Sequence, residues 1–590
     1  MAEKKAYYKR LDIVRGISCI MVLLYHLNIL KGGFLAVCTF FTLSGYLECT
    51  SAMKNRDFSL KKFYTNRLKK IYFPLIVVVA ITVVLTKLIT SINWINLKQE
   101  TLSVVFGYNN FWQLKANLDY FTRNIASPFM HLWYISILMQ FDLVFPLFVT
   151  LFKKINRGKR KSISTFVVGA CTLAFTVLFF VMSKKQDIMV VYYNTFTRVF
   201  SLLLGVFIAL LNNNYEFKFS RIFGKNDKIT FTIYMVALIA LSIFVSAESS
   251  NYAIYMILAT IISAGLIECS IKESKKTRKY DKQIKGLAKI SYVVYLVQYP
   301  VIFFLQNTPI NDFFKIVFTI ILTFITGYII QLLINFSIKN KITKYLKIAI
   351  VIAIIAGGSY FVINEKDHSE EMKALENKLS ENLKITEERN NQFLENTNTE
   401  EEKKEETVKA SSEEVIDESK IDEIVTNLPV VGIGDSVLLT PIEDLYTTFP
   451  KGYFDGKISR AIPGGIEVAK TLKNKGKLTN TVILCLSTNG IFNESKLDEL
   501  MEIMEDREIY WINAVGADDP KFNQKFASYA SNHPNIHIVT WDQTVKSHPE
   551  YLEPDKIHPN YKGGKAMVKL IYDTIHDVYL QKAKAGKTKV

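Results

Sequence analysis

The sequence contains few cysteines, and their positions exclude several classes of protein. Of the six cysteines in 590 residues, only Cys485 lies in the polar part of the chain. The others fall in or beside apolar segments: Cys19, Cys38, Cys49, Cys171 and Cys269. Their spacing forms neither a disulfide framework nor a set of metal ligands. We therefore expect no metal and no tightly bound cofactor, and the polar part can lie outside the cell without a disulfide.

We also expect no cleavable signal peptide, because the first apolar segment has no small-residue cleavage site and further apolar segments follow it. Apolar residues, in contrast, make up 49% of the chain. Almost all the long apolar runs lie in residues 1–365. The pattern predicts a multi-span α-helical membrane domain over 1–365, in contact with a lipid bilayer, followed by a soluble part.

About eleven segments are long enough to cross the bilayer core, which takes about 20 residues. They lie near 11–29, 34–50, 72–91, 132–152, 163–183, 197–212, 230–247, 252–269, 288–306, 312–337 and 346–364. The net charge of +17 arises mainly from Lys and Arg in alternate loops, which is the pattern of membrane topology rather than of nucleic-acid binding. With a cytoplasmic N-terminus, an odd number of spans places everything after residue 364 outside the cell.

Residues 366–426 are rich in Glu, Lys, Asn, Thr and Ser. Leu375, Leu379 and Leu383 indicate a short helix, whereas the run from Glu400 to Glu414 cannot bury a core. We predict a charged extracellular linker that contains a flexible tether.

Residues 427–590 alternate between apolar runs and helical patterns. Four runs are typical of buried strands: 429–433, 481–486, 508–513 and 536–539. Helical patterns such as 496–505 and 521–531 lie between them. This alternation predicts a three-layer α/β domain with a parallel sheet covered on both faces.

Polar residues follow these strands where active sites of parallel sheets lie, beyond the carboxyl ends. Ser436 follows the first strand, and Asn489 follows the strand at 481–486. Asp555 and His558 are three residues apart near the C-terminus. His can deprotonate Ser, Asp can orient the imidazole, and an Asn amide is a good oxyanion donor. Each motif is common alone, but this ordered set indicates nucleophilic acyl chemistry.

Residues 427–582 resemble an SGNH (GDSL-type) hydrolase domain. The resemblance implies that Ser436 is the nucleophile, His558 the base and Asp555 its orienting residue. It also implies three oxyanion donors: the Asn489 amide, the Ser436 backbone amide and the Ser459 backbone amide.

Arg15 and His26 stand out in the first apolar segment. They are eleven residues apart, which places them on one helix face roughly 16 Å apart along the axis. Ionisable residues inside a membrane are functional by default. The alternatives are that Arg15 snorkels to the cytoplasmic surface and that His26 contacts lipid headgroups.

Motifs along residues 8–340 resemble the membrane acyltransferase-3 family. They include Phe63 to Pro74, His131 to Ser136, and Tyr295 to Pro300. The resemblance implies that Arg15 and His26 form an essential motif and that Arg67 binds the acyl donor. A cationic loop there suits the phosphates of acetyl-coenzyme A.

Two positions depart from that family pattern. Leu138 stands where the family often has Glu, and Gln298 stands where it often has His. These two positions therefore cannot carry acid–base work in this chain.

The two halves together resemble the peptidoglycan O-acetyltransferases of Gram-positive bacteria. The resemblance implies transfer of acetyl from cytoplasmic acetyl-coenzyme A to the C6 hydroxyl of N-acetylmuramic acid, through an acetyl ester on Ser436. Three alternatives stay open. One is another exported glycan, such as teichoic acid or capsule, as the acceptor. The others are a membrane-tethered esterase and a transporter that carries a binding module.

Overall fold

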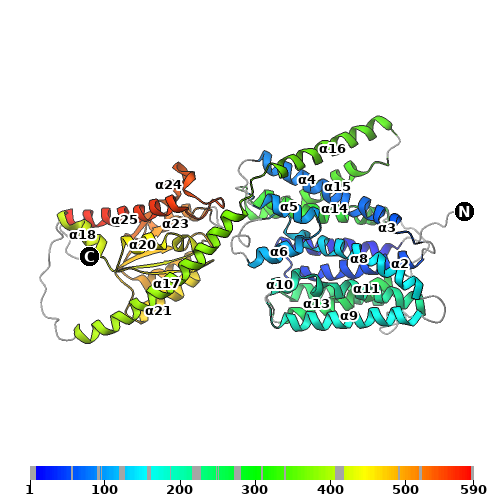
Figure 1. Ribbon diagram of the computed structural model, residues 1–590, viewed down its shortest axis with the longest axis horizontal. Coiled ribbons are helices and arrows are strands. Elements are labelled where there is room, and N and C mark those ends of the chain that lie inside the picture. The colour runs from blue at the N-terminus through cyan, green and yellow to red at the C-terminus, as the bar shows by residue number, and fades with distance from the viewer. Residues whose placement is uncertain are drawn as a thin grey trace. The chain divides into compact units, whose positions relative to one another are not determined.

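The computed structural model forms two compact units, Met1–Asp367 and His368–Val590 (Figure 1). It describes residues 8–54, 58–89, 94, 96–118, 127–155, 161–186, 188–215, 227–246, 249, 251–271, 281–306, 308, 310–337, 340–404, 418–489, 492–516 and 521–585.

The first unit is a bundle of long helices. Its principal helices are α1 (Lys9–His26), α2 (Ala36–Lys54), α3 (Leu60–Arg67), α4 (Phe73–Leu88), α5 (Leu97–Val105), α6 (Asn109–Leu118), α8 (Trp133–Ile155), α9 (Lys161–Ser183), α10 (Ile188–Tyr193), α11 (Thr195–Tyr215), α12 (Asp227–Phe244), α13 (Tyr252–Ile271), α14 (Asp281–Gln306), α15 (Asp312–Ile334) and α16 (Lys341–Ile363). Within the described residues, ten helices are long and apolar enough to span a membrane. The expected eleventh span corresponds to α1. This helix is less apolar than the ten, because its first two turns carry four charged side chains.

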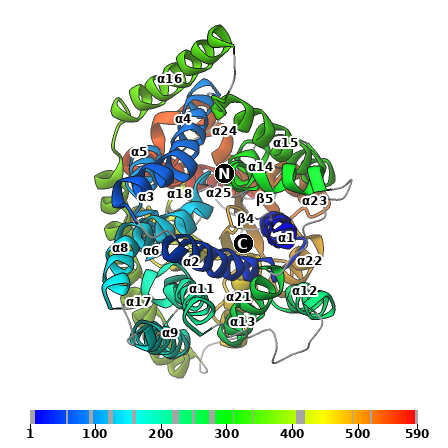
Figure 2. The same ribbon diagram turned by 90° about the vertical axis from the view of Figure 1, so that its right-hand side faces the viewer.

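Close packing of α2 on α11 depends on two glycines. A Cβ added at Gly45 would lie 2.1 Å from the Leu202 carbonyl oxygen, and one at Gly205 would lie 2.1 Å from the Thr42 carbonyl oxygen. Small residues at such crossings let helix backbones touch in a membrane. Beside α2, α1 packs on both α2 and α14 (Figure 2).

The second unit is built on a five-stranded parallel sheet in the order β2-β1-β3-β4-β5. The strands are β1 (Val430–Gly434), β2 (Tyr453–Gly456), β3 (Thr481–Cys485), β4 (Glu508–Ile512) and β5 (Ile536–Val539). The helices are α18 (Ile421–Asn427), α19 (Ser436–Leu439), α20 (Ile442–Thr448), α21 (Ile462–Asn474), α22 (Glu494–Met504), α23 (Phe522–Ala530), α24 (Trp541–Ser547) and α25 (Tyr561–Lys584).

Side chains of the strands alternate between two apolar layers, one shared with α20 and α25 and the other with α21, α22 and α23. A parallel sheet buried on both faces explains the continuous apolar runs in the sequence. The predicted three-layer fold is confirmed, with β2 as an additional edge strand.

Much of the segment expected to be a linker is a long helix, α17 (Ser369–Lys404). Leu375 and Leu379 are buried, and Asn382 Nδ2 donates to the Leu439 and Thr440 carbonyl oxygens at 2.9 and 3.1 Å. Asn390 Nδ2 donates to the Phe454 carbonyl oxygen at 2.8 Å. This part of the linker therefore belongs to the second unit, because one face of a charged helix pairs with the β2 edge. Residues 405–417, which include most of the expected tether, lie outside the described residues.

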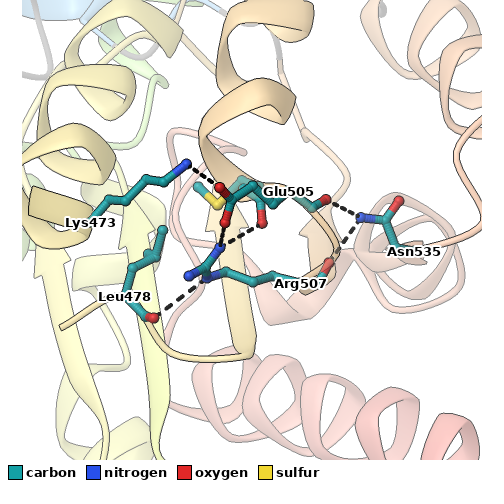
Figure 3. A network of polar contacts seen from close by, with 6 residues as sticks. Lys473, Leu478, Glu505, Arg507 and Asn535 are labelled. Carbon is teal, nitrogen blue, oxygen red and sulfur yellow. Dashed lines mark hydrogen bonds and ion pairs between the residues drawn. The ribbon is translucent and has the colours of Figure 1, made fainter. Parts of the chain in front are cut away.

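A polar network fastens the amino ends of the strands (Figure 3). Glu505 accepts from Lys473 Nζ at 2.7 Å and from Arg507 Nη1 at 2.8 Å. Asn535 Nδ2 donates to the Arg507 carbonyl oxygen at 2.9 Å. This network lies at the end of the sheet opposite to the residues expected to be catalytic, so its role is structural.

Candidate functional site

The structure brings Ser436, His558 and Asp555 together beyond the carboxyl end of β1. His558 Nε2 lies 2.9 Å from Ser436 Oγ, and His558 Nδ1 lies 2.6 Å from Asp555 Oδ2. All three residues are buried, with at most 5% of the surface of each exposed. A carboxylate only accepts, so Nδ1 carries hydrogen and Nε2 is free to take the Ser436 proton.

A tight turn brings the side chains of Asp555 and His558, three residues apart, into contact. Asp555 Oδ1 accepts from the backbone amides of Ile557 and His558 at 2.9 and 3.0 Å. One carboxylate thus folds its own loop with one oxygen and orients the imidazole with the other. The geometry is that of a nucleophile, a base and an orienting acid.

Asp435 lies within this site, although the sequence analysis gave it no role. Its Oδ1 accepts from the Val437 amide at 2.8 Å, and its Oδ2 accepts from Asn489 Nδ2 at 3.0 Å. Burial raises the pKa of Asp435 to about 6, although these hydrogen bonds act in the opposite direction. Asp435 therefore ties the predicted oxyanion donor Asn489 to the turn that holds Ser436. Its position before the first residue of a helix, where Asp is favoured as a cap, was the available signal.

Ser459 adopts a backbone conformation that favours glycine, with φ of 60°. The neighbouring Arg460 holds the segment against the end of β1. Its Nη1 donates to the Gly434 carbonyl oxygen at 3.1 Å, and its Nη2 pairs with Asp455 Oδ1 at 2.6 Å. The sequence analysis missed this role of Arg460.

In the membrane unit, His26 lines a cavity of about 580 Å³. The other polar and aromatic lining residues include His131, Tyr192, Tyr193, Tyr295 and Tyr299. His26 lies on α1, and these other residues come from α10, α14 and the short helix Met130–Leu132. A cavity of this size is in the range of small-molecule sites.

Arg15 and Arg67 line a second cavity of about 150 Å³, so α1 places Arg15 and His26 in different cavities. Arg15 Nη1 lies 3.4 Å from Asp12 Oδ1. Arg67 pairs with Glu48 and, at 3.0 Å, with Asp142. The guanidinium expected to bind the acyl donor is therefore already matched by two carboxylates.

Residues 8–336 match a family profile described as an acyltransferase domain, which covers more than half of the chain. The chain belongs to this acyltransferase family. The prediction of a multi-pass membrane acyltransferase is thereby confirmed. In the described part of the chain, no three His, Cys, Asp or Glu side chains are grouped to hold a metal ion.

Relatives align with this acyltransferase from end to end. A putative O-acetyltransferase of Staphylococcus aureus strain MSSA476 is 27% identical over 96% of both chains. The O-acetyltransferase OatA of Staphylococcus aureus strain MRSA252 is 26% identical, also over 96% of both chains.

A solved structure also matches the C-terminal part. It is the C-terminal catalytic domain of Streptococcus pneumoniae peptidoglycan O-acetyltransferase A with a methylsulfonyl adduct. The match is 24% identical with a TM-score of 0.24, and it covers 28% of this chain and 99% of that one.

Proposed function

We propose that this acyltransferase moves acetyl from cytoplasmic acetyl-coenzyme A to hydroxyls of a cell-wall glycan outside the membrane. We propose the C6 hydroxyl of N-acetylmuramic acid in peptidoglycan as the acceptor. The observation that carries the proposal is one chain that joins a membrane acyltransferase unit to a preformed Ser436–His558–Asp555 site. The end-to-end similarity to proteins named O-acetyltransferase supports the same acyl group.

The external step follows from the triad. Ser436 Oγ attacks the carbonyl carbon of the incoming acetyl donor while His558 Nε2 takes the serine proton. The donor's leaving group departs with that proton, and an acetyl ester remains on Ser436. A sugar hydroxyl then attacks the ester, gives its proton to His558, and releases Ser436. Asn489 and the backbone amides of Ser436 and Ser459 would stabilise the oxyanion in both steps.

The membrane step begins at the cavity that contains Arg15 and Arg67. Acetyl-coenzyme A carries several phosphates, and guanidinium groups bind phosphate with charge-assisted hydrogen bonds. The Arg15 side chain is 34% exposed, whereas Arg67 is held by Glu48 and Asp142. Binding of phosphate by Arg67 would therefore exchange one anionic partner for another.

The first test measures acetate released by base from purified peptidoglycan. Three strains are compared: wild type, a deletion strain, and the deletion strain complemented with Ser436→Ala. Acetate in the wild type alone would support both the acceptor and the nucleophile. Equal acetate in all three strains would discard peptidoglycan, and the same comparison on teichoic acid and capsule would then identify the glycan.

A further inference from the structure

The helix α17 carries a stripe of buried side chains along one face, although most of its residues are charged or polar. The buried members follow alternate spacings of three and four residues, the period of a helix face that packs on another surface. They are Met372, Leu375, Leu379, Asn382 and Thr386. Asn382 is strongly polar and yet only 3% exposed. A buried amide in such a stripe fixes what the helix pairs with, so its partners indicate the role of α17.

Asn382 holds the carboxyl end of α19, the short helix that begins with Ser436. Its Nδ2 atom donates to the carbonyl oxygens of Leu439 and Thr440, at 2.9 and 3.1 Å. The last carbonyl groups of a helix have no partner within that helix and need one from elsewhere. Since α19 has only four residues, its own hydrogen bonds fix its place weakly. The Asn382 amide therefore supplies contacts that α19 cannot supply itself.

Thr440 carries this contact directly to the nucleophile. The Thr440 backbone amide and Oγ1 both donate to the Ser436 carbonyl oxygen, at 3.0 and 2.8 Å. The Thr440 carbonyl oxygen in turn accepts from Asn382. Asn382 and Ser436 are thus joined through one residue. The place of Ser436 Oγ matters, because it lies 2.9 Å from His558 Nε2 and a shift of about 1 Å can cost a hundredfold in rate.

We propose that Asn382 is a positioning residue that holds Ser436 in place against His558. This rests on the proposed function, in which Ser436 is the nucleophile. No proton and no acyl group passes through Asn382. Its two hydrogen bonds fix the end of α19, so that the serine oxygen stays within reach of the base. The helix α17, which has the composition of a linker, then forms part of the acyl-transfer site.

A second asparagine on α17 provides a matched comparison. Asn390 Nδ2 donates to the Phe454 carbonyl oxygen at 2.8 Å, and Asn390 Oδ1 lies 3.4 Å from the Tyr446 hydroxyl. These partners belong to β2 and α20 rather than to α19. Both asparagines thus fasten α17 to the second unit through their side-chain amides. Of the two, Asn382 does so through the helix of the nucleophile.

The test follows two reactions of Ser436 in the full-length protein in detergent, with Ser436→Ala as the background. One is hydrolysis of 4-nitrophenyl acetate, which gives kcat and KM. The other is labelling of Ser436 by phenylmethylsulfonyl fluoride, which gives a rate of attack and, by mass, the final labelled fraction. Asn382→Asp keeps the shape of the side chain but turns oxygen atoms toward the two carbonyl groups. We expect kcat and the labelling rate to fall about tenfold, with KM within twofold and labelling still complete.

Two further variants separate position from stability. Asn382→Leu has a similar volume without donors and should reproduce the loss of rate. Asn390→Leu removes the comparable contact with β2, and its kcat and labelling rate should stay within twofold of wild type. Amide hydrogen exchange of β1 compares the stability of the second unit in these two variants.

Three results would overturn this role of Asn382. The first is kcat and labelling within twofold of wild type in Asn382→Asp. The second is an equal loss in Asn382→Leu and Asn390→Leu. The third is a labelled fraction that falls in proportion to kcat, because the loss would then come from unfolded molecules. A wild type without Ser436-dependent hydrolysis or labelling would instead reject the proposed nucleophile, and this role of Asn382 with it, so the two failures are distinguishable.

Discussion

The site in the second unit and the cavity in the membrane unit differ in how their buried polar groups are hydrogen-bonded. In the second unit, the Ser436–His558–Asp555 chain is closed by hydrogen bonds, and Asp435 and Asn489 bond to each other. In the membrane cavity, the δ nitrogens of the His26 and His131 imidazoles have no partner in the described residues. A hydrogen-bond network whose donors and acceptors are all paired is rigid before substrate binds. A network with unpaired groups is completed by the ligand. The site in the second unit is therefore preorganised, whereas the membrane cavity depends on its ligand.

The largest effect should come from breaking the closed site. Ser436→Ala should lower glycan acetylation by about 10⁴-fold or more, because the triad acts as one unit. The variant removes one hydroxyl and should leave the fold intact. Acetate bound to purified cell wall, with the amount of protein in membranes as the control, measures this. Acetylation at a tenth of the wild-type level would exclude Ser436 as the nucleophile.

How far this site could be predicted follows from the distances along the sequence. Asp555 and His558 share one turn, and Ser436 follows a strand, so local patterns indicated each candidate. The pairing of His558 with Ser436, 122 residues away, was predicted from the order of the motifs and the family resemblance. The roles of Asp435 and Arg460 depend on partners 54 and 26 residues away. The buried face of α17 likewise needed a sheet edge that only the fold supplies. Composition alone describes that segment as charged, which is true of its exposed face.

The membrane cavity was harder to predict for the same reason. Its two histidines are 105 residues apart in the sequence, and aromatic residues of α10 and α14 complete the walls. Periodicity placed Arg15 and His26 on one helix face, but not in one cavity. A helix face passes several neighbours along its length, and the packing of those neighbours decides which cavity each residue lines.

The next effect in size concerns the buried charge of Asp435 in the second unit. The carboxyl of Asp435 has its pKa raised from 3.8 to about 6, chiefly by burial. The folded state therefore binds this proton more tightly than the unfolded state. The cost of the buried charge is present in full above pH 6, and it disappears as the pH falls toward 3.8. This difference in pKa corresponds to about 3 kcal/mol of folding free energy.

Asp435→Asn should remove this pH dependence and lower transfer about tenfold, because Asn489 loses its anionic partner. Amide hydrogen exchange of β1 in the full-length protein, corrected for intrinsic rates, measures the local free energy of opening. We expect the wild type to gain stability relative to the variant between pH 6 and pH 4. A constant difference across that range would mean that Asp435 does not titrate there.

Two arginines at opposite ends of the sheet sharpen the comparison within the second unit. Arg460 clamps the Ser459 segment at the catalytic end, whereas Arg507 joins Glu505 and Asn535 at the amino ends (Figure 3). Arg460→Met should lower Ser436-dependent ester hydrolysis several-fold. Arg507→Met, which also removes a cation with several contacts, should lower only stability, by about 1 to 3 kcal/mol. Equal losses of hydrolysis in both variants would show that Arg460 acts through stability alone.

The smallest effect should come from Ser459, whose φ of 60° is unfavourable for a residue with a side chain. Glycine relieves about 1 to 2 kcal/mol of backbone strain but loses about 0.5 to 1 kcal/mol through the freedom of the unfolded chain. Ser459→Gly should therefore stabilise the second unit by up to about 1.5 kcal/mol and leave ester hydrolysis unchanged. Hydrogen exchange and the 4-nitrophenyl acetate assay measure the two quantities. If hydrolysis fell while stability rose, the Ser459 hydroxyl itself would act at the site, and the backbone amide would not be its only contribution.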